Sequence, residues 1–344
     1  MKGLTTDVHR FARIPAAWLG FATSLILLYI SCSPDPPAPA HAFYHWQTEL
    51  EVNDSLLTTY AAERLYIKAF DVSWEEGLAQ PSAILVAGDT FGIEAVPVVF
   101  ITNEVFTHPT DGLAHDILRL LAQRFPFPYT ELQIDCDWTA GTQVQYFSFL
   151  QSLREASGKQ ISATVRLHQY RDRAAQGVPP VDRGVLMAYN TGDLGSWETE
   201  NSIVDTTVIE AYVAGQPPYP LPLDLAVAVY DWAAVYRRGE LAYLINEPDL
   251  EELADTARFT ATGPLRYRVD SSTYYAGLYL YRGDLLRREI AGREEAIRLA
   301  GDLWSRVAGA ESRYVIFYRM GSRGWSDHPS SEYSLNSRTQ IHRS

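Results

Sequence analysis

Short apolar runs of the kind that form β-strands recur along most of the chain, separated by stretches with helical spacing. The eight runs are 43–48, 64–70, 95–101, 131–137, 160–167, 184–189, 223–230 and 313–319. Between several of them, apolar residues recur every three or four positions, as in a helix with one buried face. Such helices are expected at 111–124, 142–157, 205–214 and 293–307. Strand and helix therefore alternate, which predicts parallel strands joined by right-handed crossovers.

Eight strands in about 280 residues predict an α/β fold of the (β/α)₈ barrel type, for which ~250 residues are typical. An open, doubly wound sheet is the alternative, but a nucleotide-binding sheet would carry a glycine-rich phosphate turn, and neither GxGxxG nor GxxxxGK[ST] occurs. Two stretches exceed the barrel plan, 71–92 and 231–291. The second, between strands seven and eight, is long enough for an inserted subdomain. We place the barrel at 43–320 and a polar tail at 321–344.

The N-terminal region has the pattern of an export signal. Lys2, Arg10 and Arg13 precede fifteen uncharged residues at 16–30, which are too few to cross ~30 Å of hydrocarbon comfortably but suit a secretory signal. The run ends in LYISC, which resembles a bacterial lipobox with Cys32 as the acylated residue. An ordinary signal peptide or a buried apolar segment is the alternative.

The residues after this run resemble a tether. Segment 32–42 is rich in proline and alanine, and such sequences form semi-rigid polyproline II spacers. We therefore expect residues 1–31 to be a lipoprotein signal peptide and Cys32 to carry a lipid anchor. The expected location is the bacterial cell envelope, on the outer membrane or the cell surface.

The composition of the chain limits the classes of partner and cofactor that we expect. The chain has 29 Lys and Arg against 42 Asp and Glu, a net charge of −13, and loss of residues 1–31 would change it to −15. With no run of basic residues, this charge argues against nucleic acid as a partner. Only Cys32 and Cys136 are cysteines, which excludes a disulfide-stapled scaffold. The eight histidines form no HExxH motif, so we expect no metal site and no cofactor.

Acidic residues gather where the fourth run ends. Strand alternation places Asp135, Asp137 and Thr139 on one side, toward the barrel lumen, with Cys136 and Trp138 facing outward. Active sites of such barrels lie at the C-terminal ends of the strands. Two neighbouring carboxylates there would raise one pKa, which indicates either a functional site or a buried polar network.

This strand and the helix after it resemble the D-x-x-D-x-D-x-E motif of the chitinase-like (family 18) glycoside hydrolases. In the same order, LMAYN at 186–190 resembles the family's sixth strand and LAVAVY at 225–230 its seventh, and 313–318 stands in the place of its eighth. The resemblance covers about residues 43–320 and implies a barrel that binds glycan. The combination FYHWQT…QIDCDWT also looks like a bacterial family of exported proteins without an assigned function.

The chain departs from the motif at its most important residue. The motif's first acid falls on Leu132, its second and third fall on Asp135 and Asp137, and its terminal glutamate falls on Thr139. In that family the glutamate protonates the glycosidic oxygen, a step that threonine cannot perform. The resemblance therefore implies a glycan-binding barrel without the standard acid.

Three hypotheses stay open from the sequence. The first is an exported, lipid-anchored barrel that binds glycan. The second is an active glycosidase that uses Asp137 with Glu104 or Asp231, with Asp71 as a further candidate acid. The third is a structural or partner-binding surface lipoprotein.

Aromatic and polar residues at the strand ends are the candidate ligand contacts, because flat rings with polar edges suit the C–H faces of sugars. By strand alternation Arg166 and His168 share a side, and we expect them to neutralise Asp135 or Asp137. The candidates are Tyr189, Asn190, Tyr230, Trp232, Tyr318, Arg166, His168, Met187 and Thr139.

Overall fold

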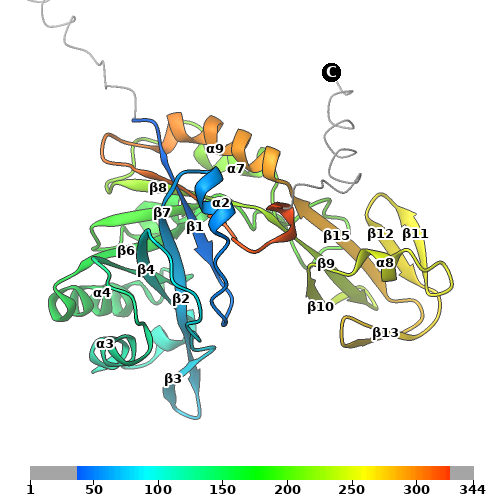
Figure 1. The fold of residues 1–344 in the computed structure, drawn as a ribbon, viewed down its shortest axis with the longest axis horizontal. Coiled ribbons are helices and arrows are strands. Elements are labelled where there is room, and N and C mark those ends of the chain that lie inside the picture. The colour runs from blue at the N-terminus through cyan, green and yellow to red at the C-terminus, as the bar shows by residue number, and fades with distance from the viewer. Residues whose placement is uncertain (1–36, 326–344) are drawn as a thin grey trace, which may run out of the picture. The chain divides into compact units, whose positions relative to one another are not determined.

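The computed structural model describes residues 37–325, which contain a closed barrel of eight parallel strands (Figure 1). The strands are β1 (Ala40–His45), β2 (Ala62–Glu75), β4 (Glu94–Ile101), β5 (Glu131–Asp135), β6 (Gln160–Arg166), β7 (Arg183–Met187), β8 (Leu223–Ala228) and β16 (Tyr314–Tyr318). Pairing of β1 with both β16 and β2 closes the barrel. The predicted (β/α)₈ barrel is thereby confirmed.

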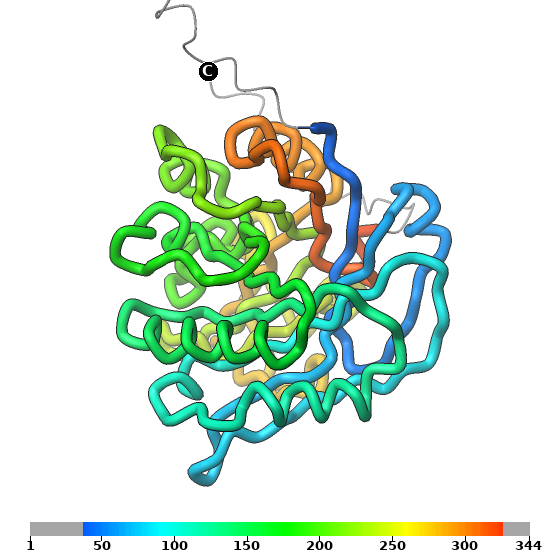
Figure 2. The backbone as a smooth tube through the Cα atoms, turned by 90° about the vertical axis from the view of Figure 1, so that its left-hand side faces the viewer, coloured from blue at the N-terminus to red at the C-terminus, as the bar shows by residue number. Residues whose placement is uncertain are grey.

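Helices lie along the outside of these strands, as Figure 2 shows from the side of α3 and α4. They are α2 (Asp54–Thr59), η1 (Asn103–Thr107), α3 (Leu113–Arg124), α4 (Gln143–Ser157), α5 (Leu167–Arg171), α6 (Arg173–Gln176), α7 (Thr206–Val213) and α9 (Arg293–Val307). Local chemistry fixes several of their ends. The carboxylate of Asp205 accepts from the N–H groups of Thr207 and Val208 at the start of α7. Gly158, with φ of +61°, ends α4 in the left-handed conformation that glycine adopts easily.

The barrel strands alternate between two environments, as parallel strands under a helical layer must. Apolar side chains such as Leu132 and Ile134 of β5 are fully buried in the main hydrophobic core. The intervening residues Glu131, Gln133 and Asp135 are also buried but bond to polar groups of neighbouring strands. The lumen is therefore polar and aromatic along its length.

A second sheet is formed by the residues between β8 and β16. It runs in the order β10 (Glu240–Asn246), β9 (Tyr230–Arg237), β15 (Leu285–Ala291), β12 (Arg266–Val269) and β11 (Phe259–Gly263), all antiparallel. The short helices α8 (Leu250–Leu253) and η2 (Arg323–Trp325) and the hairpin β13 (Thr273–Tyr275) and β14 (Leu278–Leu280) complete this region and the C-terminal end. Since β9 follows directly on β8, the second sheet begins at the C-terminal end of the barrel strands, which we call the mouth.

The other long stretch, 71–92, extends β2 beyond the barrel and returns as β3 (Leu78–Ser82), which pairs with it antiparallel. At the N-terminal side, β1 begins at Ala40 and so takes in the last residues of the predicted tether. The predicted signal peptide, Cys32 and the part of the tail beyond 325 lie outside the described residues. Within 37–325, no helix is long and apolar enough to cross a membrane.

Candidate functional site

Asp135 is the most perturbed acid at the mouth. It ends β5, is 4% exposed, and accepts a 2.6 Å hydrogen bond from the hydroxyl of Thr164 on β6. Burial raises its pKa from 3.8 to about 6, against the opposing effect of Arg166, while Asp137 and Asp71 add to the rise. A carboxyl that titrates near neutrality at a strand end is a candidate functional group.

Asp137 stands beside it but is held as an ion pair. It lies two residues beyond β5 with a half-exposed side chain, and both of its oxygens accept from Arg166, through Nε and through one terminal nitrogen at 2.9 Å. The expectation that Arg166 neutralises one of these acids is confirmed. Such a bidentate pair fixes the position and orientation of the Asp137 carboxylate.

Six rings from three strands and two loops form the aromatic cluster of the mouth: Tyr44, Trp46, Tyr189, Tyr230, Trp232 and Tyr318. Tyr318 is its centre, stacked on Tyr189 at 5.3 Å and 20°, with Trp46 at 5.6 Å and Tyr230 at 5.6 Å between ring centroids. Tyr189 and Tyr230 are each 4% exposed, whereas Trp46, Trp232 and Tyr318 are partly exposed. The accessible ring surface therefore belongs to the last three.

Residues around the end of β7 complete this cluster. Met187 is buried, and Asn190, with φ of +55°, accepts a 2.7 Å hydrogen bond from the hydroxyl of Tyr230. The hydroxyl oxygen of Tyr189 is buried and has no hydrogen-bond partner among residues 37–325. Buried polar groups are nearly always paired, so this hydroxyl calls for a partner from outside the protein, a water molecule or a ligand.

Thr139, at the position of the family's glutamate, is exposed at the rim of the mouth. Its hydroxyl lies 3.3 Å from that of Thr142, which donates a 2.5 Å hydrogen bond to Asn103 of η1. Glu104 follows Asn103 on the same short helix and is exposed. Glu104 therefore lies on the element that contacts the Thr139 region.

Asp231 does not stand free at the mouth. It lies in β9, is 0% exposed, and is bound by the guanidinium groups of Arg288, at 3.1 Å, and Arg323. A carboxylate so enclosed cannot reach a substrate, which removes Asp231 as a replacement acid. Trp232 is held in the same sheet, since its indole N–H donates to Glu289 at 3.0 Å.

The expectation that His168 follows Arg166 along the strand was wrong. Strand β6 ends at Arg166 and α5 begins at Leu167, so the two side chains no longer share a strand face, and His168 is exposed. The cause is local: the side-chain oxygen of Gln169 accepts a 2.7 Å hydrogen bond from the backbone N–H of Arg166, which caps the start of the helix.

Sequence reasoning missed three contributors to the site. Thr164 bonds Asp135, and alternation with Arg166 on the same predicted strand could have indicated it. Tyr44 donates a 2.6 Å hydrogen bond to Gln133 below Asp135. Lys68 pairs with Asp71 at 3.0 Å and lies 5.8 Å from the ring of Trp46. Nothing in the sequence spacing of Lys68 and Trp46 indicates that the two side chains are in contact.

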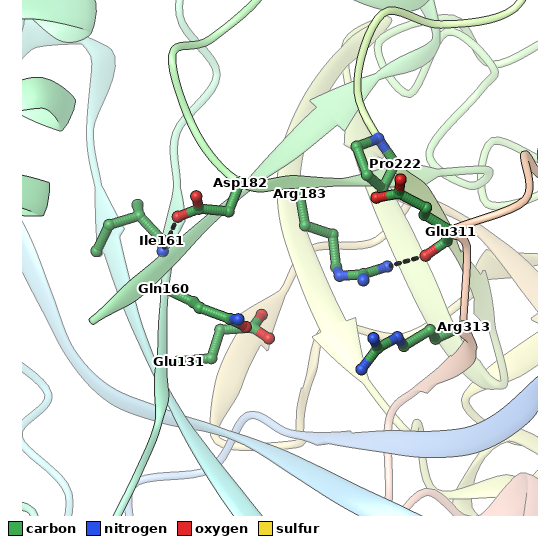
Figure 3. A pocket seen from close by; sticks show the side chains of 8 residues that line it. All are labelled: Glu131, Gln160, Ile161, Asp182, Arg183, Pro222, Glu311 and Arg313. Atoms are coloured by element: carbon green, nitrogen blue, oxygen red, sulfur yellow. Dashed lines mark hydrogen bonds between the residues drawn. The ribbon is translucent and has the colours of Figure 1, made fainter. Parts of the chain in front are cut away.

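Two pockets lie at the opposite, N-terminal end of the barrel strands. One, of about 270 Å³, is lined almost wholly by polar residues, as Figure 3 shows. Several of its charged groups already have partners in the protein: Arg183 donates to Asp224 and to the backbone oxygen of Glu311, and Asp182 accepts from the N–H of Ile161. This end of such barrels generally serves stability. The other pocket, of about 370 Å³, is a shallow apolar groove that includes Phe91 and Phe127.

Among residues 37–325, no group of three or more His, Cys, Asp or Glu side chains is arranged to hold a metal ion. Cys136 is buried with a free thiol, and Trp138 is buried on the helical side, stacked on Tyr146 of α4 at 5.3 Å.

Comparison with solved structures finds chains that this one is similar to over most of its length. The structure is similar to the spore cortex-lytic enzyme SleL of Bacillus cereus, with 13% sequence identity, 84% of this chain and 72% of that chain covered, and a TM-score of 0.46. It is also similar to a chitinase of Chromobacterium violaceum, with 13% identity, 89% and 100% covered, and a TM-score of 0.49. Neither a protein-family model nor a curated protein matches the sequence.

Proposed function

We propose that the mouth of the barrel binds a glycan and does not hydrolyse it by the mechanism of the chitinase-like hydrolases. The observation that carries this proposal is the buried hydroxyl of Tyr189, which has no partner within the described residues and belongs to a ring stacked on that of the central Tyr318. A sugar hydroxyl would satisfy it, while the partly exposed rings of Trp46 and Tyr318 would cover an apolar sugar face.

The acids of the mouth support binding over hydrolysis. Thr139 occupies the position of the family's proton donor, both oxygens of Asp137 are bound by Arg166, and Asp231 is enclosed. Glycosidases generally need two carboxyl groups at a defined separation across the scissile bond. Of the acids proposed to restore activity, Glu104 is the one that is exposed and not ion-paired within residues 37–325.

A Tyr189→Ala variant is expected to bind soluble N-acetylglucosamine oligosaccharides at least tenfold more weakly than the wild type, measured by isothermal titration calorimetry. The reason is the loss of one hydrogen bond to the sugar and of the ring that packs against Tyr318, together worth roughly 1–3 kcal/mol. Tyr212→Ala, a partly buried tyrosine on α7, is the matched control and should leave the affinity unchanged.

A chromogenic N-acetylglucosaminide assay on the same proteins tests the absence of hydrolysis. We expect no turnover by the wild type. Robust turnover by the wild type would overturn the proposal. If the Glu104→Gln variant then showed no turnover, Glu104 would be identified as the acid. Failure of the wild type to bind any of the oligosaccharides would also overturn it.

The function includes anchoring of the barrel to a bacterial envelope through a lipid on Cys32, which the LYISC motif and the following Pro/Ala-rich segment support. Palmitate fed to cells that express the full chain should label the wild type but not the Cys32→Ala variant. A Ser33→Ala variant serves as the control and should be labelled like the wild type. Equal labelling of wild type and Cys32→Ala would refute the anchor.

A further inference from the structure

Exposed tyrosines concentrate on the hairpin of β13 and β14, and none of them belongs to the aromatic cluster of the mouth. Tyr274 of β13, Tyr279 of β14 and Tyr281 just beyond it are 70%, 40% and 52% exposed. They lie on or beside the hairpin that β13 and β14 form (Figure 1). Large side chains this exposed mark a surface that contacts something else.

The three rings form a continuous row. Tyr274 and Tyr279 meet at 5.0 Å and 69°, and Tyr279 and Tyr281 meet at 5.0 Å and 85°, so the middle ring is steeply inclined to both neighbours. The guanidinium of Arg237 lies 4.3 Å from the ring of Tyr281 and 5.5 Å from that of Tyr243, which extends the row onto β10. None of the hydroxyls of Tyr274, Tyr279 and Tyr281 is hydrogen-bonded within the described part of the chain.

The row carries no net charge. Arg237 is its cation, and this residue binds the carboxylate of the buried Asp284 at 2.8 Å. The chain as a whole has a net charge of −13. A neutral row on an acidic protein is suited to an uncharged partner and is poorly suited to an anionic lipid surface.

The row is also too small for a stable protein partner. Tyrosine side chains bury roughly 150–250 Å² each, so three rings at these exposures offer roughly 250–400 Å², against ~800 Å² per partner in a typical protein interface. The size and neutrality of the row suit a narrow, uncharged ligand. Apolar faces on such a ligand would pack on the rings, and its hydroxyls would bond to the free phenol groups.

We propose that Tyr274, Tyr279 and Tyr281, together with Arg237, form a second binding surface, for an extended neutral polysaccharide chain. This surface is separate from the glycan site proposed at the mouth. The second surface shares no residue with the mouth, and the ligand proposed for it is a polymer.

The test is co-sedimentation of the full chain with insoluble chitin and with cellulose. Relative to the wild type, the triple variant Tyr274→Ala/Tyr279→Ala/Tyr281→Ala should bind at least one of these polymers tenfold more weakly or worse. The double variant Leu78→Ala/Val144→Ala removes two comparably exposed apolar side chains elsewhere and should bind like the wild type. If the triple variant does not fold, Tyr274→Ala, at the most exposed ring, replaces it and should weaken binding at least threefold.

Several outcomes would overturn the second surface. The first is equal polymer binding by the wild type and the triple variant, and the second is no binding of either polymer by the wild type. The third is that the tyrosines are needed for binding to phosphatidylglycerol vesicles or for self-association, and not for binding to a polymer. The mouth is tested separately. The Tyr189→Ala variant should lose oligosaccharide binding but still sediment with the polymer. The triple variant should keep oligosaccharide binding but no longer sediment with the polymer.

Discussion

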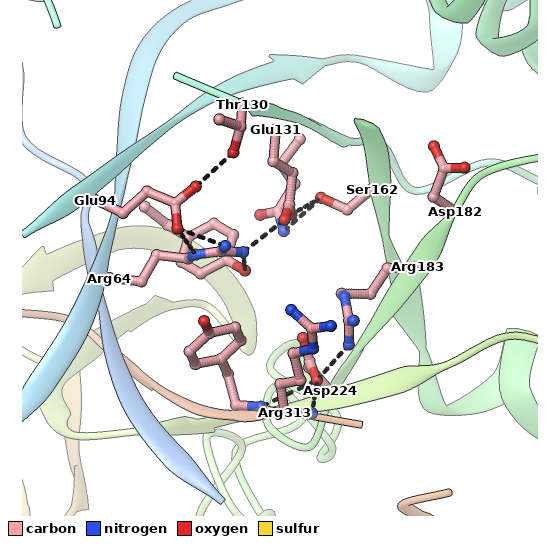
Figure 4. Close-up of polar contacts among 12 residues, drawn as sticks. Arg64, Glu94, Thr130, Glu131, Ser162, Asp182, Arg183, Asp224 and Arg313 are labelled. Carbon is pink, nitrogen blue, oxygen red and sulfur yellow. Dashed lines mark hydrogen bonds and ion pairs between the residues drawn. The ribbon is translucent and has the colours of Figure 1, made fainter. Parts of the chain in front are cut away.

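Replacing Arg64 by methionine is expected to lower the free energy of unfolding by about 3–5 kcal/mol. Arg64 lies near the N-terminal end of β2 and is 7% exposed. Its guanidinium reaches two carboxylates, Glu131 of β5 and Glu94 of β4, each at 2.6 Å (Figure 4). Because Glu131 is only 1% exposed, removal of its partner leaves a charge inside the barrel without a counter-ion.

Neighbouring contacts hold this ion network rigidly. Ser162 of β6 donates to Glu131 at 2.6 Å, and Thr130 donates to Glu94 at 2.6 Å. The ring of Tyr314 lies 4.6 Å from the guanidinium of Arg64. Methionine fills much of the same space but neutralises neither acid, so the cost is mainly electrostatic.

Denaturant-induced unfolding measures this loss, with Arg119→Met as the matched control. Arg119 pairs with Asp116 at 2.8 Å, but the two side chains are 70% and 61% exposed, and such surface pairs contribute about 0–1 kcal/mol. The double variant Arg64→Met/Glu131→Gln should recover part of the stability by removing the unpaired charge. A loss in Arg64→Met no larger than that in Arg119→Met would contradict the interpretation of a buried network.

The barrel could be predicted from the sequence because its determinants are local. Each strand is an apolar run of the right length, and α3, α4, α7 and α9 begin and end within two residues of the positions that helical spacing predicts. The first strand was predicted at 43–48, whereas β1 begins at Ala40 and pairs with β16 from that residue onward. The prediction began too late because the proline and alanine residues at 37–40 resemble a tether.

The site could be predicted only where it depends on one strand or its direct neighbour. Asp135, Asp137 and Arg166 follow from alternation along β5 and β6. The enclosure of Asp231 depends on Arg288 and Arg323, which are 57 and 92 residues away in the chain, and no local pattern reports such a contact. The helical turn at His168 depends on a single cap by Gln169, which outweighs the strand-like pattern before it.

An Asp135→Asn variant is expected to become more stable than the wild type as the pH rises, by up to roughly 3 kcal/mol at pH 7. Burial in the lumen raises the pKa of Asp135 to about 6, whereas the unfolded chain has the ordinary value of 3.8. Below pH ~4 the carboxyl is protonated in both states and costs nothing. Between pH ~4 and ~6 the unfolded state ionises first, so the wild type loses stability as the pH rises through this window and stays lower above it.

Asparagine has almost the same shape as aspartic acid and cannot ionise. Its side-chain oxygen can still accept the hydrogen bond that Thr164 donates to Asp135. Arg166 and Asp137 bind each other in the variant as in the wild type, so the main change is the charge at one buried position. The variant therefore isolates the ionisation of Asp135 from the packing around it.

Urea unfolding of both proteins at pH 4 and pH 7 measures the effect, with Asp116→Asn, at an exposed carboxylate, as the control. The difference between Asp135→Asn and wild type should grow with pH, while the control difference should stay within ~0.5 kcal/mol. A difference that is equal at both pH values would mean that folding does not shift the pKa of Asp135, and a difference that falls with pH would mean that the lumen stabilises the charged form. Asparagine at position 135 would therefore serve the stability of the barrel better than aspartate does, and a buried carboxyl with a raised pKa is a common feature of functional sites.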